Sequence, residues 1–140
     1  MTRSRVRMYI YANVEGEAAD KMEEALTVAR REALKSVEVF RLGAALVRRR
    51  SVIASGRNRN LNSCGLSSIH AEMDAAWKID RRPAKFQQLH LVVVRVTRDQ
   101  DKPGCSKPCP ACMRSLQRIG IRKITYTTGD SANPLNTIAL

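Results

Sequence analysis

The sequence predicts an α/β protein in which helices pack on a layered sheet. Residues 17–39 repeat apolar side chains with helical spacing, whereas residues 89–96 form a nearly unbroken aliphatic run, which is typical of a strand buried on both faces. Single helical segments separate the later strands, as right-handed crossovers in a layered sheet require. With 140 residues, of which 44% are hydrophobic and 27% charged, the chain has the size and composition of one globular domain.

The N-terminal part is expected to form a basic arm followed by a long helix. Residues 1–15 alternate basic and apolar side chains, which favours a flexible arm before a single domain of residues 16–140. Between residues 17 and 39, apolar residues recur every three or four positions and define the stripe of an amphipathic helix. These residues are Met22, Leu26, Ala29, Ala33 and Val37.

A hairpin, a loop and a second helix are predicted next. Residues 44–47 and 51–55 are short runs typical of strands, and the three arginines between them form a turn that lacks the usual glycine or asparagine. Residues 56–68 contain two glycines and three asparagines, so we expect a loop there. A helix is predicted over residues 69–80, because Pro83 ends it.

The C-terminal part is predicted to continue as strand, helix and strand. The aliphatic run of residues 89–96 forms the first of these elements. A helix follows over residues 110–119, with a proline at its first position and Gly120 as its C-terminal stop. Residues 123–128 form the next strand, and the remaining length suits a short antiparallel strand through Ile138.

Charge is the largest departure from an average composition. Lysine and arginine number 25 against 13 acidic residues, which gives a net charge of +12. A field of this sign attracts anions such as phosphates, so single-stranded nucleic acid stays open as a partner. The six aromatic residues are few for a row of base-stacking platforms, and a GC-rich genome would also produce many arginines.

Membrane and export segments are not expected from the sequence. No window approaches the roughly 18–20 apolar residues that span a bilayer, and the first residues lack the apolar block of about 7–15 residues of a secretory signal. We therefore expect a cytoplasmic protein with no membrane partner. In that compartment the four cysteines argue for metal binding or catalysis rather than for disulfides.

One histidine and two cysteines form the pattern of a catalytic metal site. Cys109 and Cys112 are three positions apart on one predicted helical turn, so both sulfurs can bind one ion, and His70 supplies a third ligand. Because zinc is tetrahedral, three protein ligands leave one position for water. Glu72 follows His70 by two residues, and we expect it to carry protons at this position. The two side chains converge only if His70 lies at the very start of its helix.

A different zinc site uses cysteines alone. Cys64, Cys105, Cys109 and Cys112 would make a closed structural site with four sulfur ligands. The protein would then be a non-catalytic, basic module that binds nucleic acid. This alternative leaves the His70-Ala71-Glu72 segment and the aliphatic α/β core without a role.

Taken together, these motifs resemble those of the cytidine deaminase superfamily. The segment HAE at residues 70–72 and the segment PCPAC at residues 108–112 match the signature of its zinc deaminases. FRLGAAL at residues 40–46, GRN at residues 56–58 and the Gly65-Leu66 pair are similar to further stretches of the superfamily. The resemblance therefore covers roughly residues 40–128.

The resemblance implies a fold and a reaction. The fold is a three-layer α/β/α arrangement with a central mixed sheet of four to five strands. The reaction is hydrolytic deamination, which converts cytosine to uracil in a cytidine or deoxycytidine nucleoside or nucleotide and releases ammonia. His70, Cys109 and Cys112 hold Zn²⁺, and Glu72 moves protons between the attacking water and the base.

The resemblance also implies how a substrate is held. The backbone N–H of Ala71 contacts the base, Asn58 contacts the sugar, and Phe40 lines the pocket. Asn60 stands where nucleoside-type enzymes usually carry a sugar-binding glutamate, which weakens the case for a free nucleoside. The superfamily further suggests a homodimer or homotetramer.

The nature of the substrate stays open at the level of sequence. Arg57, Arg59 and Arg114 offer positive charge to a 5′-phosphate, and the same residues also suit a solvated surface. A deaminase of bases in single-stranded DNA, RNA or tRNA would use the net charge to hold the backbone of its substrate. Whether the target base is cytosine or adenine depends on the shape of the pocket.

Overall fold

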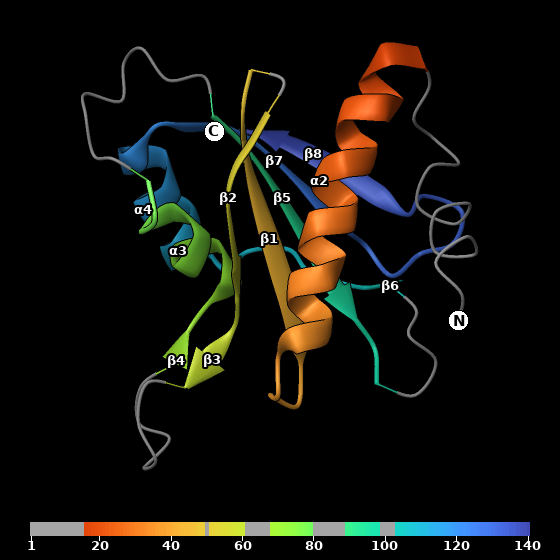
Figure 1. Ribbon diagram of the computed structural model, residues 1–140, viewed down its shortest axis with the longest axis vertical. Coiled ribbons are helices and arrows are strands. Elements are labelled where there is room, and N and C mark those ends of the chain that lie inside the picture. Colours follow the sequence, from red (N-terminus) through yellow and green to blue (C-terminus); the bar gives the residue numbers. More distant parts are fainter. Residues whose placement is uncertain (1–15, 50, 61–67, 80–88, 99–102) are drawn as a thin grey trace.

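A computed structural model describes residues 16–49, 51–60, 68–79, 89–98 and 103–140 (Figure 1). The predicted arm of residues 1–15 lies outside these residues. In chain order the described elements are α2 (Gly16–Lys35), β1 (Arg41–Arg48), β2 (Ser51–Arg57), β3 (Arg59–Asn60), β4 (Ser68–Ile69), α3 (Ala71–Ala76), β5 (Leu89–Val96), β6 (Pro103–Gly104), α4 (Pro110–Ile119), β7 (Ile121–Thr127) and β8 (Leu135–Ala139). None of the helices in the described ranges combines the length and apolarity needed to cross a bilayer.

The described strands form a mixed sheet with the order β2-β1-β5-β7-β8, and the two-residue strand β6 pairs with β5 as well. Strands β5 and β7 are parallel, whereas the other pairs are antiparallel. Helix α2 covers one face, and α3 and α4 cover the other (Figure 1). The predicted three-layer α/β/α fold is therefore confirmed, including the antiparallel last strand, and the sheet has one short strand more than expected.

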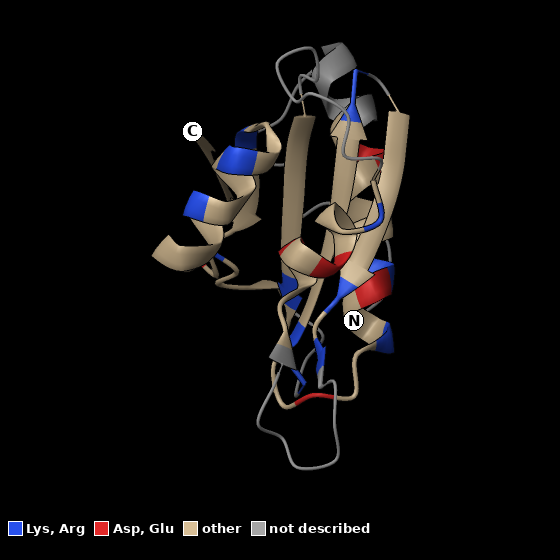
Figure 2. Ribbon diagram, turned by 90° about the vertical axis from the view of Figure 1, so that its left-hand side faces the viewer, with Lys and Arg blue, Asp and Glu red and all other residues tan. Residues whose placement is uncertain are grey.

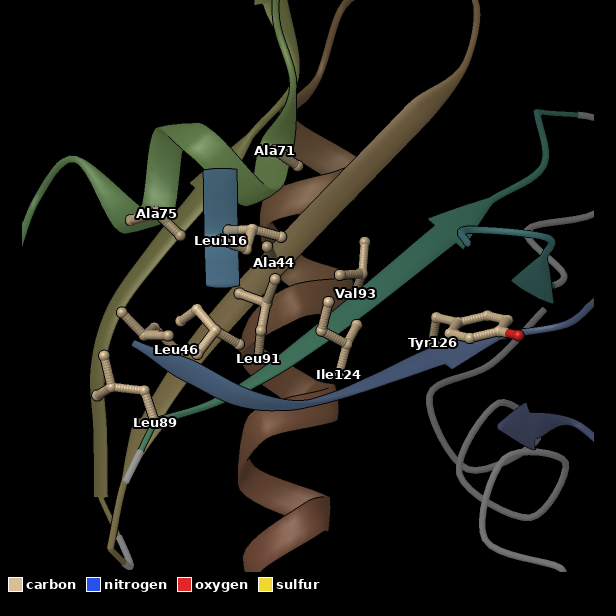
Figure 3. Packing of buried hydrophobic residues seen from close by; sticks show 12 residues of the cluster. Ala44, Leu46, Ala71, Ala75, Leu89, Leu91, Val93, Leu116, Ile124 and Tyr126 are labelled. Carbon is tan, nitrogen blue, oxygen red and sulfur yellow. The ribbon is translucent and has the colours of Figure 1, made fainter. Parts of the chain in front are cut away.

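Alternating side chains of β1 and β5 divide the interior into two cores. Ala44 and Leu46 face α3 and α4, whereas Ala45 and Val47 face α2. Figure 3 shows the first core, in which side chains of the two helices meet those of β1, β5 and β7. Its labelled members include Ala71, Ala75, Leu116, Leu46, Leu91, Val93 and Ile124. Strand β5 is buried on both faces, as its aliphatic run predicts.

Helix α2 ends four residues earlier than the apolar pattern predicts. Lys35 is its last residue, and the side chain of Val37 is 85% exposed instead of continuing the buried stripe. The buried hydroxyl of Ser36 donates to the carbonyl of Asn58 at 3.0 Å and accepts from the backbone N–H of Glu38 at 3.3 Å. These bonds hold the chain out of the helix, because a serine hydroxyl offers the backbone other partners.

The predicted loop of residues 56–68 is wrong at its two ends. Strand β2 continues to Arg57, and the pairs of residues in β3 and β4 form a small separate sheet, while residues 61–67 lie outside the described ranges. In the turn between β1 and β2, Arg49 adopts a φ of +57°, the left-handed conformation for which a glycine is usual. Strand β7 begins at Ile121, two residues before its predicted start.

Helix α3 is shorter than predicted, whereas α4 has its predicted bounds. The helix expected over residues 69–80 spans Ala71–Ala76, because Ile69 belongs to β4 and His70 is the N-cap. Residues 77–79 form turns. Helix α4 starts with its proline and ends at Gly120, whose φ of +106° is the left-handed cap that glycine favours.

Two glycines let helices approach the sheet from opposite sides. A Cβ atom on Gly43 would overlap the carbonyl oxygen of Ala29 in α2, and one on Gly56 would overlap the backbone nitrogen of Ala75 in α3. The two glycines lie in neighbouring strands, since Ala44 pairs with Gly56. Close helix–sheet approach at this point therefore depends on the missing side chains.

Candidate metal centre and adjoining pocket

The first turns of α3 and α4 bring the three expected metal ligands together. His70 is the N-cap of α3 and Cys109 is the N-cap of α4, both in extended conformation with ψ angles of 151° and 159°. Pro110 fixes the first turn of α4, and Cys112 lies in this turn on the same side as Cys109. The position of His70 before the helix, rather than within it, allows its side chain to converge with that of Glu72.

The ligand atoms of this cluster are within 4.8 Å of one another. The Nδ1 atom of His70 lies 3.1 Å from the Sγ atom of Cys112, and the backbone N–H of Cys112 donates to the Sγ atom of Cys109 at 3.4 Å. His70 and Cys109 are exposed, whereas Cys112 is buried. Residues separated by about forty positions in the chain thus share one small volume.

The chemistry of the donor set fits Zn²⁺. Tetrahedral zinc with Zn–N near 2.0 Å and Zn–S near 2.3 Å places its ligand atoms roughly 3.5–3.8 Å apart, close to the spacing of this cluster. Without a cation, burial, the neighbouring Cys109 sulfur and the Glu72 carboxylate raise the pKa of Cys112 to about 12. A divalent cation between the ligands would favour the thiolate, because it opposes each of these effects.

Glu72 is a buried carboxylate that is not fully paired. Its residue is 3% exposed, and its Oε2 atom has no hydrogen-bond partner among the described residues. The same atom lies 4.0 Å from the Nδ1 atom of His70. Burial raises the pKa of Glu72, although His70 and the backbone N–H of Glu72 partly oppose this shift. An orphaned buried oxygen beside a metal-binding cluster is a strong sign of a functional group.

A pocket of about 420 Å³ opens beside the cluster. Six of the eight site residues expected from sequence line it, namely Phe40, Asn58, His70, Ala71, Glu72 and Cys109. Cys112 is buried and does not line the pocket. Asn60 belongs to β3, and its side chain lies outside the described part of the chain. The remaining lining residues are Glu38, Val39, Leu42, Arg59, Ile69, Lys107 and Pro108.

Asn58 has a structural task that the sequence did not reveal. Its Nδ2 atom donates to the carbonyl of Phe40, and its Oδ1 atom accepts from the backbone N–H of Leu42 at 2.9 Å. The amide therefore holds the start of β1 in place while the residue lines the pocket. Each amide atom keeps one further hydrogen-bonding position for a ligand.

Asp74 and Arg59 form a pair that sequence analysis missed. Asp74 is buried in α3, and its Oδ1 atom accepts from the Nη2 atom of Arg59 at 2.9 Å and from its Nε atom at 3.2 Å. The partner of Arg57 is Glu32, at 3.8 Å. Two of the three arginines considered for phosphate binding are thus paired with carboxylates, and the third, Arg114, does not line the pocket.

Lys107 is a pocket-lining cation that the sequence analysis did not single out. It stands two residues before Cys109, so proximity to a ligand motif was the available signal. Cys105 is exposed and is not part of the metal cluster found among the described residues, and Cys64 lies outside those residues. The arrangement therefore favours the His/Cys/Cys set over the closed set of four cysteines.

Comparisons with known proteins agree with this geometry. The sequence matches the family of the cytidine and deoxycytidylate deaminase zinc-binding region over residues 17–128. Comparison with curated proteins gives no match. Among solved structures, the dCMP deaminase of cyanophage S-TIM5 is similar with a TM-score of 0.62 and 20% identity, covering 84% of this chain and 92% of that one.

Two bacterial cytidine deaminases are also similar in structure. That of Burkholderia pseudomallei has a TM-score of 0.61 and 23% identity, with 84% of this chain and 91% of that chain covered. That of Mycobacterium tuberculosis has a TM-score of 0.56 and 17% identity, with coverages of 81% and 87%. These likenesses show the fold, and the family match spans most of the chain with a donor set that fits Zn²⁺. The chain therefore belongs to the family of the cytidine and deoxycytidylate deaminase zinc-binding region.

Proposed function

We propose that this protein is a zinc-dependent hydrolase that converts cytosine to uracil in cytidine or deoxycytidine nucleosides or nucleotides, with release of ammonia. The observation that carries the proposal is the buried Oε2 atom of Glu72, which has no partner among the described residues and lies 4.0 Å from His70. The same carboxylate lines a pocket of about 420 Å³ that has room for a small ligand.

His70, Cys109 and Cys112 would hold the zinc ion, which when bound lowers the pKa of water towards neutrality. Glu72 would take the proton of the attacking water. Its protonated oxygen would then deliver this proton to ring N3. Glu72 would next take the proton of the hydroxyl group newly bonded to the base and pass it to the amino group, which leaves as ammonia as the C–N bond breaks. Burial suits this exchange, because the raised pKa of Glu72 makes it a better proton acceptor.

The pocket residues would orient the base. Ala71 is the first residue of α3, so its backbone N–H has no acceptor within the helix and is available to a ligand. Phe40 supplies an aromatic wall, and Asn58 retains hydrogen-bonding capacity for a sugar. Asn60 is proposed as a further sugar contact, on the basis of its position in the sequence.

One assay tests the reaction and its substrate together. The purified zinc protein is offered cytidine, deoxycytidine, their monophosphates, adenosine and single-stranded oligonucleotides, and ammonia release is measured. The proposal expects ammonia from one or more of the cytosine nucleosides or nucleotides. Ammonia from oligonucleotides alone would instead favour a nucleic-acid deaminase, whose binding would weaken steeply with salt because of the net charge of +12.

Replacement of Glu72 separates an enzyme from a binding module. Glu72→Gln is expected to lower turnover about 10²- to 10⁴-fold while zinc content is retained. Glu24→Gln, which alters an exposed residue of α2 on the opposite face of the sheet, serves as the matched control. Unchanged turnover in Glu72→Gln would reject the proposed mechanism.

A homodimer or homotetramer and a cytoplasmic location belong to the same proposal. The resemblance suggests the oligomer, and the composition of the chain suggests the location. Light scattering on the purified protein would give the assembly directly. A monomeric mass at assay concentration would reject the oligomer.

A further inference from the structure

Arg95 is an anomalous residue within the buried strand β5. It interrupts the aliphatic run between Val94 and Val96, and it is partly buried. Its Nε atom is buried with no hydrogen-bond partner, and no carboxylate in the described residues forms an ion pair with it. A partly buried cation without a counter-charge is costly, so its presence calls for a compensating contact.

That contact is the aromatic ring of Phe40. The Cζ atom of Arg95 lies 4.5 Å from the centroid of the Phe40 ring, within the range of a cation–π interaction. The register of the sheet explains the meeting, because Leu42 of β1 pairs with Arg95 of β5. Phe40 lines the pocket, whereas Arg95 is not among the residues that line it.

The side chain of Arg95 has a prepared path to this ring. Gly104 of β6 pairs with Arg95, and a Cβ atom at Gly104 would lie 3.1 Å from the Cδ atom of Arg95 and 3.3 Å from its Cγ and Nε atoms. The glycine thus leaves room for the aliphatic stem of the arginine. The backbone of Phe40 is held separately, because its carbonyl accepts from Asn58.

We propose that Arg95 is a positioning residue that holds the ring of Phe40 in the orientation needed to bind the substrate base. Phe40 is 57% exposed, so without a partner its ring would turn freely at the mouth of the pocket. Arg95 contacts this ring but does not line the pocket, so it would leave the rest of the ring surface to the ligand. The inference rests on the proposed function, since it assigns the bound base to the wall formed by Phe40.

Two variants of Arg95 separate its charge from its bulk. Arg95→Met keeps a long apolar stem but lacks the cation, whereas Arg95→Lys keeps a cation that can lie over the ring. Arg118→Met removes an exposed arginine from the last turn of α4 and is the matched control. Zinc content and melting temperature show that each variant is loaded and folded.

The test combines steady-state kinetics with a spectrum of the ring itself. Phenylalanine labelled with ¹³C in the ring gives signals from two residues, and the Phe40 signal is assigned by its loss in Phe40→Leu. We expect Arg95→Met to shift this signal and to raise KM about threefold to tenfold with little change in kcat. In Arg95→Lys we expect the Phe40 signal and KM to return most of the way to their wild-type values. In Arg118→Met we expect the signal and KM to stay unchanged.

The possible failures are distinguishable. An unchanged ring signal in Arg95→Met, or a shifted signal with unchanged KM, would overturn the positioning role while the deaminase proposal stands. Equal losses in Arg95→Met and Arg95→Lys would assign the effect to packing and also overturn it. A wild-type protein that deaminates no cytosine compound would overturn the proposed function, and the inference with it.

Discussion

The carboxylate of Asp74 accepts a hydrogen bond from the backbone N–H of Arg57 at 3.1 Å, which ties α3 to the last residue of β2. The same carboxylate holds the guanidinium of Arg59 and lies 3.6 Å from the Nζ atom of Lys78. Helix α3 carries Glu72 and begins directly after His70. Asp74 thus connects the helix that presents the candidate catalytic groups to the strand below it.

Replacement of Asp74 is expected to destabilise the fold. In Asp74→Asn the carbonyl oxygen can still accept from Arg57, but the new amide points N–H groups at Arg59 and leaves buried donors unpaired. We expect a loss of about 1–3 kcal/mol in the free energy of unfolding at pH 7, measured by urea denaturation. Glu24→Gln is the control, and an equally stable Asp74→Asn would show that this connection is unimportant.

The effect of Asp74 should depend on pH. Burial alone raises the pKa of Asp74, but hydrogen bonds from Arg59 and Arg57 and the charges of Lys78 and Arg59 lower it overall. Because the folded-state pKa is the lower one, its stabilisation is present above the unfolded value near 3.9 and is lost as pH falls through the folded value. The difference between wild type and Asp74→Asn should therefore shrink below about pH 4. A difference that grows there would contradict the assigned shift.

The buried hydroxyl of Ser106 should support the candidate zinc ligands. Ser106 stands three residues before Cys109. Its hydroxyl donates to the carbonyl of Val93 at 2.8 Å and accepts from the backbone N–H of Thr127 at 2.9 Å. Ser106→Ala leaves both backbone groups without this partner, and we expect about tenfold weaker zinc binding in competition with a chelating dye. The exposed Ser131→Ala variant is the control. An unaltered zinc affinity would show that Ser106 does not contribute to zinc binding and acts only on the stability of the fold.

Zinc content should distinguish the two cysteine assignments. Cys112→Ser is expected to lose bound zinc after dialysis, whereas Cys105→Ser should keep it, because the Cys105 thiol lies outside the described cluster. Added zinc should raise the melting temperature of metal-free wild type and Cys105→Ser, but not that of Cys112→Ser. Loss of zinc in both variants would instead favour the assignment of a site with four cysteine ligands.

The two amide atoms of Asn58 should have separable effects. Asn58→Asp keeps an acceptor for the N–H of Leu42 but replaces the donor to Phe40 by an oxygen that repels its carbonyl. Asn58→Ala removes both bonds and is expected to cost about 1–3 kcal/mol in unfolding free energy. Calorimetry compares the two variants, and equal stability of all three proteins would deny Asn58 its structural task.

Local patterns predicted the elements whose signals are self-contained. Helix α4 has its predicted bounds because a proline and Gly120 mark its ends. Strand β5 also has its predicted bounds, because an aliphatic run needs burial on both faces. The clustering of His70, Cys109 and Cys112 was also predictable, since Cys109 and Cys112 share one turn. By contrast, the end of α2 depends on a bond from Ser36 to Asn58, 22 residues away, and no spacing rule contains such information.

Contacts between distant segments also explain the side-chain pairings that were missed. Arg59 is placed in the pocket by Asp74, and Arg95 reaches Phe40 only because β1 and β5 are neighbours in a particular register. Charged side chains in a sequence give no sign of which partner they will meet. The family pattern identified the candidate site residues, and the fold revealed the residues that contact them.

The absence of side chains at Gly43 and Gly56 has a consequence for how this architecture can vary. Helices α2 and α3 are seated against the backbone of adjacent strands, which leaves no room for a Cβ atom at either glycine. His70 directly precedes α3, so the seating of this helix also positions its side chain. A saturation library screened for folded protein should consequently recover glycine alone at both positions.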